Sequence, residues 1–296
     1  GDDRLFRHMG AKKAALTLAL LELGYGVLSL DTDTVVLRDM RPWLVGEEPA
    51  GERGGEENFG LAADVLTSTD CLSPTATEGV QPPAAAGGGE APQWWWREAS
   101  AVAGEVNGNP VEAAFNTGVL FFRATPAGQR AARLWVETIL VSGGNIHGMR
   151  AHDDQQSFNM MMRDGPKEPH WLHPLTPVAG GAGRVFLALN REVRLGVWPL
   201  GMVGNGHSFF VQRAHEARGA RQPYVVHNTF QMHGTEGKRA RFASFGLWRP
   251  HEALGEPHPL EGRRFVTWDP APPPALAAEL EAEDRAAERE REEEEE

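Results

Sequence analysis

The 296-residue chain has little cysteine, little lysine and no long hydrophobic run. Its single cysteine, Cys71, excludes an internal disulfide but leaves the cellular compartment open. No stretch reaches the ~18 to 20 consecutive apolar residues of a membrane-spanning helix, and no signal peptide is evident. The chain starts at Gly1 and enters a helical pattern almost at once. We therefore interpret it as a fragment or processed region, in which a missing anchor is uninformative.

The chain also lacks a basic stripe of the kind that binds nucleic acid. Its formal net charge is -12, but residues 279–296 hold eleven acidic residues and three arginines. The rest of the chain is therefore only mildly acidic, which excludes a nucleic-acid partner. Its length and its hydrophobic content of 41% are sufficient for a full core.

Helix and strand patterns alternate along the chain. Residues 5–23 have the spacing of a helix, with Leu16, Leu20 and Leu23 on one face and Gly24 placed to end it. The apolar run "YGVLSLD" follows and is typical of a strand that is covered on both faces. This order of helix, tight turn and buried strand predicts an α/β fold.

Further elements extend this pattern. Residues 59–69 and 113–124 are predicted strands, and residues 126–141 form a predicted helix. Strand-like runs return at residues 198–213 and 223–230, separated by glycine turns. We therefore expect a sheet flanked by helices.

Three segments carry no packing signal. Residues 46–57 and 79–92 are rich in glycine, proline, alanine and glutamate, and we expect disordered surface inserts there. Residues 271–296 begin with a proline break and continue as an acidic, alanine-rich tail. The prediction is one domain over residues 1–270, followed by a disordered tail.

Two aspartates follow the first predicted strand, in "LSLDTDT". Strand alternation puts the side chains of Asp31 and Asp33 on the same side of the backbone, so both can reach one cation. Two carboxylates this close repel each other, and a divalent ion relieves that repulsion. The structural alternative is that one caps the next turn while the other forms a surface ion pair.

Two chemistries use such a pair. In a phosphatase of the haloacid-dehalogenase type, the D-x-D-x-T signature would make Asp31 the nucleophile and Asp33 the acid/base, with Mg²⁺ screening the phosphate. In a nucleotide-sugar glycosyltransferase of the GT-A type, a D-x-D holds Mn²⁺ or Mg²⁺ against a diphosphate. A full helix before the motif and the scarcity of later lysines, Lys167 and Lys238 alone, disfavour the phosphatase.

Six stretches in order resemble one family. They are "LELGYGVLSLDTDTVVLRDMRPWL", "TSTDCLSP", "AAFNTGVLFFRAT", "HDDQQSFN", "NGHSFFVQR" and "VHNTFQMHGTEGKRARF". They are similar to plant and algal nucleotide-diphospho-sugar transferases of glycosyltransferase family 77, and the last is closest to extensin arabinosyltransferases.

This resemblance implies a GT-A fold, that is, a Rossmann-like mixed sheet flanked by helices, with further strands before this fragment that would be missing here. It also implies a retaining transferase with Mn²⁺ or Mg²⁺, a UDP-sugar donor, UDP-arabinofuranose as the expected one, and a hydroxyproline-rich cell-wall glycoprotein acceptor. The location implied is the Golgi lumen, with any membrane anchor before this fragment.

The resemblance also implies roles for residues that bind the metal and the diphosphate. Asp33 is expected to coordinate the ion, with Asp31 sharing it or bonding the ribose, and His227 is the expected third ligand. His233 competes with His227 as the weaker choice. Lys238 and Arg239 follow the turn "GTEG", which would present both cations to the diphosphate, although a solvated basic loop is the alternative.

The transferred sugar is expected near "FNTG" and "DDQQSFN". Asp154, paired with Gln155, is expected to orient the acceptor or the sugar hydroxyls, while Asn116 and Thr117 would hydrogen-bond the sugar; plain turn chemistry is the alternative at Asn116. The sequence offers no obvious nucleophile, so front-face return of the acceptor hydroxyl is a hypothesis.

Two further alternatives remain at this point. In residues 94–96, three tryptophans in a row, at least one indole should be exposed, which suits stacking on a carbohydrate or a polyproline acceptor; a loop that plugs the core is the other interpretation. A catalytically silent homologue that binds a sugar or a protein would be favoured by a disrupted metal site. Asp31, Asp33 and His227 are all present.

Overall fold

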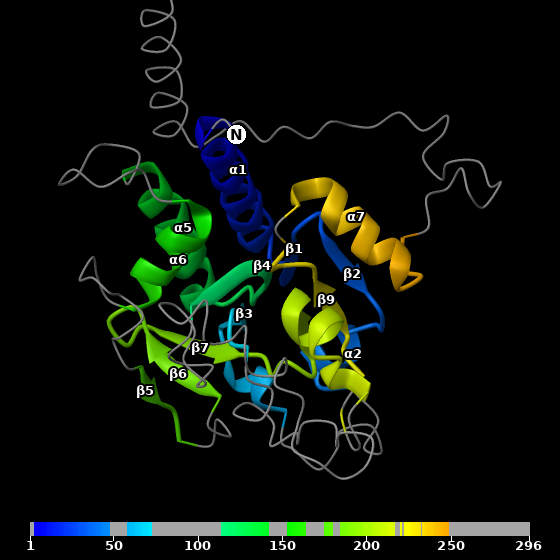
Figure 1. Cartoon of the computed structure of the whole chain (residues 1–296). Helices are drawn as coiled ribbons and strands as arrows, with labels where there is room; N and C mark the ends of the chain where they lie inside the picture. The colour runs from blue at the N-terminus through cyan, green and yellow to red at the C-terminus, as the bar shows by residue number, and fades with distance from the viewer. Residues whose placement is uncertain are drawn as a thin grey trace, which may run out of the picture.

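The computed structural model describes residues 3–47, 58–72, 114–141, 153–163, 175–179, 184–216, 220, 222–231 and 233–248. Its centre is a six-stranded sheet with the strand order β1-β4-β3-β7-β6-β5 (Figure 1). The strands are β1 (Val27–Leu30), β3 (Val65–Thr69), β4 (Phe115–Phe122), β5 (Thr176–Pro177), β6 (Val185–Ala188) and β7 (Val193–Val197). Neighbours are antiparallel except β3 and β7, which run parallel. This mixed sheet, flanked by helices, confirms the predicted fold class.

Strand direction determines which residues gather at one edge of this sheet. Both β1 and β3 run antiparallel to β4, so the carboxyl ends of β1 and β3 meet the amino end of β4. All eight residues of β4 are buried, as an apolar central strand requires. β1 is covered on both faces as predicted, since Val27 packs against one core cluster and Leu28 and Leu30 pack against the other. Its four residues are only half-buried because, within the described chain, β1 is the edge strand.

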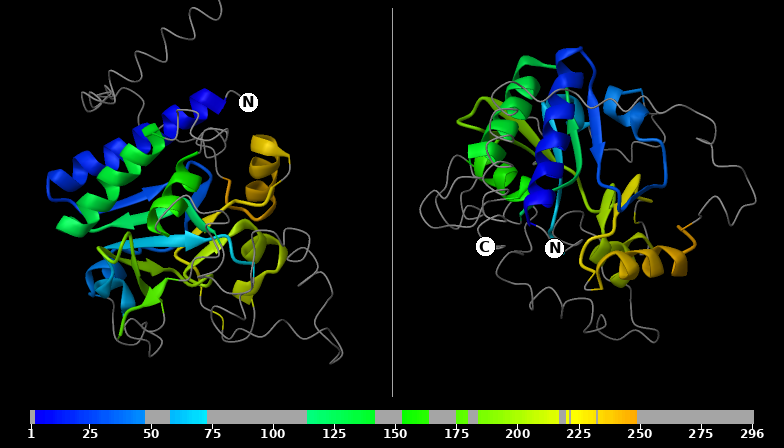
Figure 2. Two further views of the ribbon diagram at one scale, coloured as in Figure 1. Left: turned by 90° about the vertical axis from the view of Figure 1, so that its left-hand side faces the viewer. Right: turned by 90° about the horizontal axis from the view of Figure 1, so that it is seen from above.

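Two helices lie side by side over one face of the sheet (Figure 2). They are α1 (Asp3–Glu22) and α5 (Pro126–Val141), and the shorter α6 (Asp154–Met162) packs against α5. The core on this face includes Trp135, which stacks on Phe122 and meets the edge of Phe158.

The predicted apolar face of α1 needs a correction. Leu16 and Leu23 are exposed, while Ala14, Leu18 and Leu21 are buried against the sheet. At about 100° per residue the two stripes lie on nearly opposite sides of the helix, and the buried one, which also carries Ala11, packs in the core cluster that α1 shares with α5. Gly24, with a φ of 90°, ends the helix as predicted.

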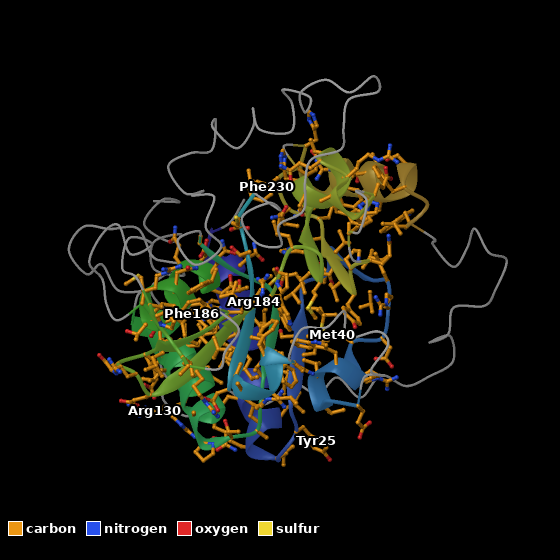
Figure 3. The ribbon with its side chains drawn as sticks, turned by 90° about the horizontal axis from the view of Figure 1, so that it is seen from below. Tyr25, Met40, Arg130, Arg184, Phe186 and Phe230 are labelled. Carbon is orange, nitrogen blue, oxygen red and sulfur yellow. The ribbon has the colours of Figure 1, made fainter. Side chains whose placement is uncertain are left out.

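The other face of the sheet carries a three-stranded sheet in the order β2-β9-β8. These strands are β2 (Thr34–Val36), β8 (Val203–Asn205) and β9 (Val225–His227). The short helices α2 (Arg41–Val45) and η1 (Phe59–Ala62) complete this layer. Met40 lies in its buried cluster, whereas Tyr25 and Arg130 lie at the surface (Figure 3).

Two predicted strands are partly helical. Residues 59–62 of the run 59–69 form η1, and β3 starts only at Val65. After β8 the chain turns into the π-helical turn η3 (His207–Val211), because Asn205 Oδ1 accepts a hydrogen bond of 2.8 Å from the amide of Ser208.

Phe209 and Phe210 of η3 form a third buried cluster with Phe242 of α7 (Gly234–Ser244). The 3-10 turn η4 (Ala214–Glu216) follows η3.

Several predictions lie outside the described residues. They concern nearly all of the insert at 46–57, the insert at 79–92, the three tryptophans at 94–96 and the tail at 271–296. Among the described helices, none combines the length and the hydropathy that a membrane crossing requires.

Candidate metal and donor-binding site

Strand pairing brings the acidic pair to a histidine nearly two hundred residues later. The antiparallel register of β2 and β9 places Thr34 opposite His227, and Asp33 directly precedes β2. His227 Nε2 therefore lies 3.2 Å from Asp33 Oδ1 and 3.7 Å from Asp31 Oδ2. Ligand atoms from these three residues all lie within 4.8 Å of one another, as one shared cation requires.

Asn116 determines which nitrogen of His227 faces the carboxylates. His227 Nδ1 lies 2.9 Å from Asn116 Oδ1, and the same oxygen accepts a hydrogen bond of 2.8 Å from the amide of Gly118. Because an amide oxygen only accepts, His227 Nδ1 carries the proton. The lone pair of neutral Nε2 then points at the two carboxylates, which is the orientation that a metal ligand needs.

Gly118 makes room for the imidazole. A Cβ at this position would lie 1.9 Å from His227 Cε1 and 2.2 Å from Nδ1, far inside van der Waals contact. Gly118 sits within β4 in extended backbone, so the strand itself does not demand glycine. The close approach of the His227 ring is what requires glycine at this position.

The electrostatics favour an ionised Asp33. Burial alone would raise the pKa of this carboxyl, but hydrogen bonds and positive charge outweigh burial and hold the pKa well below its ordinary value; the imidazolium form of His227 contributes to them, and Lys238 supplies them in either protonation state of His227. Lys238 Nζ donates to Asp33 Oδ2, opposite the oxygen that faces His227. Asp33 therefore keeps its negative charge, as a cation ligand must.

A lysine on α1 links the acidic pair to α6. Lys13 Nζ lies 2.6 Å from Asp31 Oδ1 and 3.4 Å from Asp154 Oδ2, and it donates to the carbonyl oxygen of Thr117 at 2.9 Å. Its side chain is only 17% exposed. This partly buried cation partly offsets the negative charge of both carboxylates.

Asp154 begins α6 and is held there from several sides. Its backbone carbonyl accepts a hydrogen bond of 2.8 Å from Trp135 Nε1, and its Oδ2 accepts one of 3.2 Å from the hydroxyl of Thr117. The preceding Asp153 caps the helix through the amide of Gln156. Asp154 is therefore a preorganised carboxylate, and Thr117 is buried beside it.

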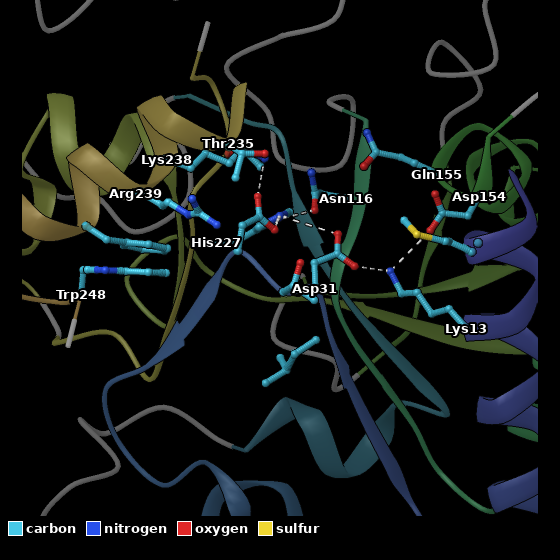
Figure 4. A pocket seen from close by; sticks show the side chains of 17 residues that line it. Lys13, Asp31, Asn116, Asp154, Gln155, His227, Thr235, Lys238, Arg239 and Trp248 are labelled. Carbon is cyan, nitrogen blue, oxygen red and sulfur yellow. Dashed lines mark hydrogen bonds and ion pairs between the residues drawn. The ribbon is translucent and has the colours of Figure 1, made fainter. Parts of the chain in front are cut away.

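These side chains line one cavity of about 800 Å³. Figure 4 shows Lys13, Asp154 and Gln155 on one side, His227 near the middle, and Trp248 on the other side. One side is rich in hydrogen-bonding groups, and the other combines the cations Lys238 and Arg239 with the aromatic rings of Phe242 and Trp248. Asp31, Asp33 and His227 lie between the two sides, which suits an elongated ligand with a charged centre.

Comparison with known proteins assigns the chain to a family. A family model described as nucleotide-diphospho-sugar transferase matches residues 2–242. The chain belongs to this transferase family. It is similar to arabinosyltransferase XEG113 of Arabidopsis thaliana, with 28% identity over 272 residues that cover 92% of this chain and 33% of that protein. The chain thus spans about a third of the length of this relative. No solved structure matches it significantly.

Lys238 and Arg239 are the two cations that are predicted from the sequence to face the diphosphate of a nucleotide-diphospho-sugar. Lys238 and Arg239 both line the cavity, but residues 234–237, predicted as a turn, form the first turn of α7. Arg239 Nη1 contacts Glu236 Oε1 at 2.9 Å, and its guanidinium lies 5.8 Å from the ring centroid of Trp248. His233, the weaker metal candidate, is exposed at the start of α7 and does not belong to the cluster of Asp31, Asp33 and His227.

Sequence reasoning missed four residues of this site. Lys13 lies 18 positions before Asp31, and only folding makes them neighbours. Asp70, in the stretch "TSTDCLSP", accepts hydrogen bonds from Asn116 Nδ2 at 2.8 Å and Gln155 Nε2 at 2.9 Å. Gly118 and Trp248 complete the set. The D/N-rich ends of strands β3 and β4 were the available signal for Asp70.

The residues present fit a divalent metal of the Mn²⁺ or Mg²⁺ type. Two carboxylates and one imidazole form the donor set, and Mn²⁺ accepts oxygen and imidazole ligands together. The lone pair of neutral His227 Nε2 faces negative oxygens, an arrangement that a bound cation relieves.

Proposed function

We propose that the protein is a metal-dependent glycosyltransferase that moves a sugar, arabinofuranose, from a UDP-sugar to a hydroxyproline-rich glycoprotein. The observation that carries the proposal is the convergence of Asp31, Asp33 and His227 on one cavity in a member of the nucleotide-diphospho-sugar transferase family. The similarity to a plant arabinosyltransferase supports the choice of sugar. The Golgi lumen is the corresponding location.

The leaving group sets the chemical demand. A UDP leaving group gathers negative charge on its β-phosphate as the glycosidic bond breaks. Bound Mn²⁺ would supply Lewis-acid stabilisation of that charge. Asp33 and His227 would hold the ion with Asp31 sharing it, while Lys238 and Arg239 add positive charge on the α7 side of the cavity.

The opposite wall suits the sugar. Asp154, Gln155 and Asn116 line it and offer both donors and acceptors to hydroxyl groups. Asp154 is engaged by Lys13 and Thr117, which favours an orienting role over a nucleophilic one. Front-face return of the acceptor hydroxyl remains the proposed route to retention.

The test uses purified protein with Mn²⁺ and, in turn, UDP-arabinofuranose, UDP-xylose and UDP-galactose, with an arabinosylated hydroxyproline peptide as acceptor. We expect UDP release and extension of the peptide with UDP-arabinofuranose. Asp33→Asn should lower Mn²⁺ affinity by more than about 100-fold, since even residues behind a ligand contribute about 10- to 100-fold. The matched control is Asp39→Asn, which alters an exposed carboxylate paired with Arg41.

Each alternative gives a different result. A phosphatase would release phosphate from an aryl phosphate in a reaction that depends on Asp31. A silent homologue would bind Mn²⁺ and UDP without transferring any of the three sugars. Either result would overturn the proposed transferase activity.

A further inference from the structure

Asp70 follows β3 and has no role in the functions assigned above. We propose that Asp70 is a positioning residue: it holds the Asn116 amide in the one orientation that keeps the proton of His227 on Nδ1 and leaves Nε2 open to a cation. This inference rests on the proposed metal-dependent function and deepens it. It concerns a residue that need not touch the metal or the donor.

Asp70 joins two elements of the site through its carboxylate. Oδ1 accepts from Asn116 Nδ2 on β4 at 2.8 Å, and Oδ2 accepts from Gln155 Nε2 on α6 at 2.9 Å. Its backbone amide donates to the carbonyl of Ala114 at 2.9 Å. An ionised carboxylate only accepts hydrogen bonds, so it requires the NH₂ end of each neighbouring amide.

The backbone around Asp70 is anchored from the second sheet. Asn205 Nδ2, at the end of β8, donates to the carbonyl of Cys71 at 2.8 Å and to that of Thr69 at 3.4 Å. Asn205 and Cys71 are both buried. The carboxylate of Asp70 is therefore presented from a fixed backbone, as a positioning role requires.

The Asn116 amide has opposite demands at its two ends. Its oxygen accepts from the amide of Gly118 at 2.8 Å and faces His227 Nδ1 at 2.9 Å, while its NH₂ donates to Asp70. A half-turn of the amide would place NH₂ against the N–H of Gly118 and oxygen against a carboxylate. Both contacts would be repulsive, so Asp70 and Gly118 select the same orientation.

This orientation matters because, without a metal, the two carboxylates beside Nε2 favour the opposite tautomer of His227. Neutral imidazole carries one proton, and the carboxylates of Asp33 and Asp31 attract it to Nε2. A proton on Nε2 blocks the lone pair that a metal needs. The oxygen of Asn116, kept in place by Asp70, draws the proton to Nδ1.

The test compares Asp70→Leu with Asp70→Asn. Leucine has a similar size but no acceptor, so the amide of Gly118 alone opposes a turn of Asn116 that would let its NH₂ donate to His227 Nδ1. Asparagine keeps one acceptor for Asn116, and Gln155 can turn its own amide to match, because its oxygen makes only a 3.4 Å contact with the amide of Thr117. The asparagine variant also removes the charge of Asp70, so it separates orientation from electrostatics.

Two readouts follow the tautomer and the metal. The first is the ¹⁵N chemical shifts of the His227 ring in metal-free protein, at a pH where the imidazole is neutral, assigned by their loss in His227→Gln. The second is Mn²⁺ affinity from titration calorimetry without nucleotide. We expect Asp70→Leu to shift the proton toward Nε2 and weaken Mn²⁺ binding about 10- to 100-fold, while Asp70→Asn and the exposed control Asp39→Leu stay within about threefold of wild type.

Three outcomes would overturn the inference. The first is an Asp70→Leu protein with the Nδ1 proton and Mn²⁺ affinity of the wild type. The second is an equal loss in the asparagine and leucine variants, which would indicate charge. The third is an effect on the Michaelis constant for the donor alone, which would indicate direct contact with the sugar. Asp70→Ala replaces the leucine variant if that protein does not fold. If wild-type protein binds no Mn²⁺, the proposed function fails, while the NMR experiment still tests Asp70.

Discussion

Replacing Gly118 by alanine tests the metal site with a single methyl group. The new Cβ would lie 1.9 Å from His227 Cε1, whereas ordinary contacts begin near 3.4 Å, so the ring must move by roughly 1.5 Å. Metal–ligand distances tolerate only about 0.2 Å. The ring would also leave Asn116, which orients it. We therefore expect Mn²⁺ affinity to fall by more than about 100-fold, or about 3 kcal/mol.

The fold should survive this change. Gly118 lies within β4 in extended backbone, where alanine is acceptable, and overpacking of this kind costs about 1 to 3 kcal/mol of unfolding free energy. The matched control is Gly204→Ala in β8, where a new Cβ meets its nearest neighbours at 3.6 Å, an ordinary contact. Calorimetric titration with Mn²⁺ measures the affinity, and thermal denaturation measures the fold. A Gly118→Ala protein that binds Mn²⁺ as tightly as the Gly204→Ala protein would refute the reasoning.

Two further predictions concern stability. Lys13→Met should lower the unfolding free energy by about 1 to 3 kcal/mol, because it leaves Asp31 and the mostly buried Asp154 without their shared cation. The exposed control Arg41→Met should leave the denaturation midpoint unchanged. Equal midpoints for the two variants would contradict the stabilising role of Lys13. Burial alone would raise the pKa of Asp64, but hydrogen bonds from Arg194 outweigh burial and lower this pKa. The Asp64 carboxylate therefore stabilises the fold at pH values above its ordinary pKa of 3.8, and it loses this effect as the pH falls through the lowered pKa of the folded state. In urea titrations across that range, the stability gap between wild type and Asp64→Asn should therefore narrow as the pH falls, and a gap that stays constant would argue against the ion pair.

The order of elements was readable from the chain because local patterns decide it. The helix at residues 126–141 was predicted with its observed bounds, since its periodicity and its proline start are local signals. The strand before the acidic pair was also correct. The helical turn at residues 207–211 was missed. The backbone amide of Ser208 donates a hydrogen bond to the side-chain oxygen of Asn205, and this contact overrides the β propensity of the phenylalanines in the turn.

The sequence by itself determined the α/β class, the D-x-D pair and the histidine at the end of a late strand, because each is a short pattern of residue types. Only the tertiary structure decided that Lys13 bridges Asp31 to Asp154 and that Asp70 accepts a hydrogen bond from Asn116. These contacts join residues 18 to 141 positions apart, and strand register and helix packing bring them within hydrogen-bonding distance. No periodicity along the chain encodes such distances, since they arise only when separate elements bury their apolar faces together.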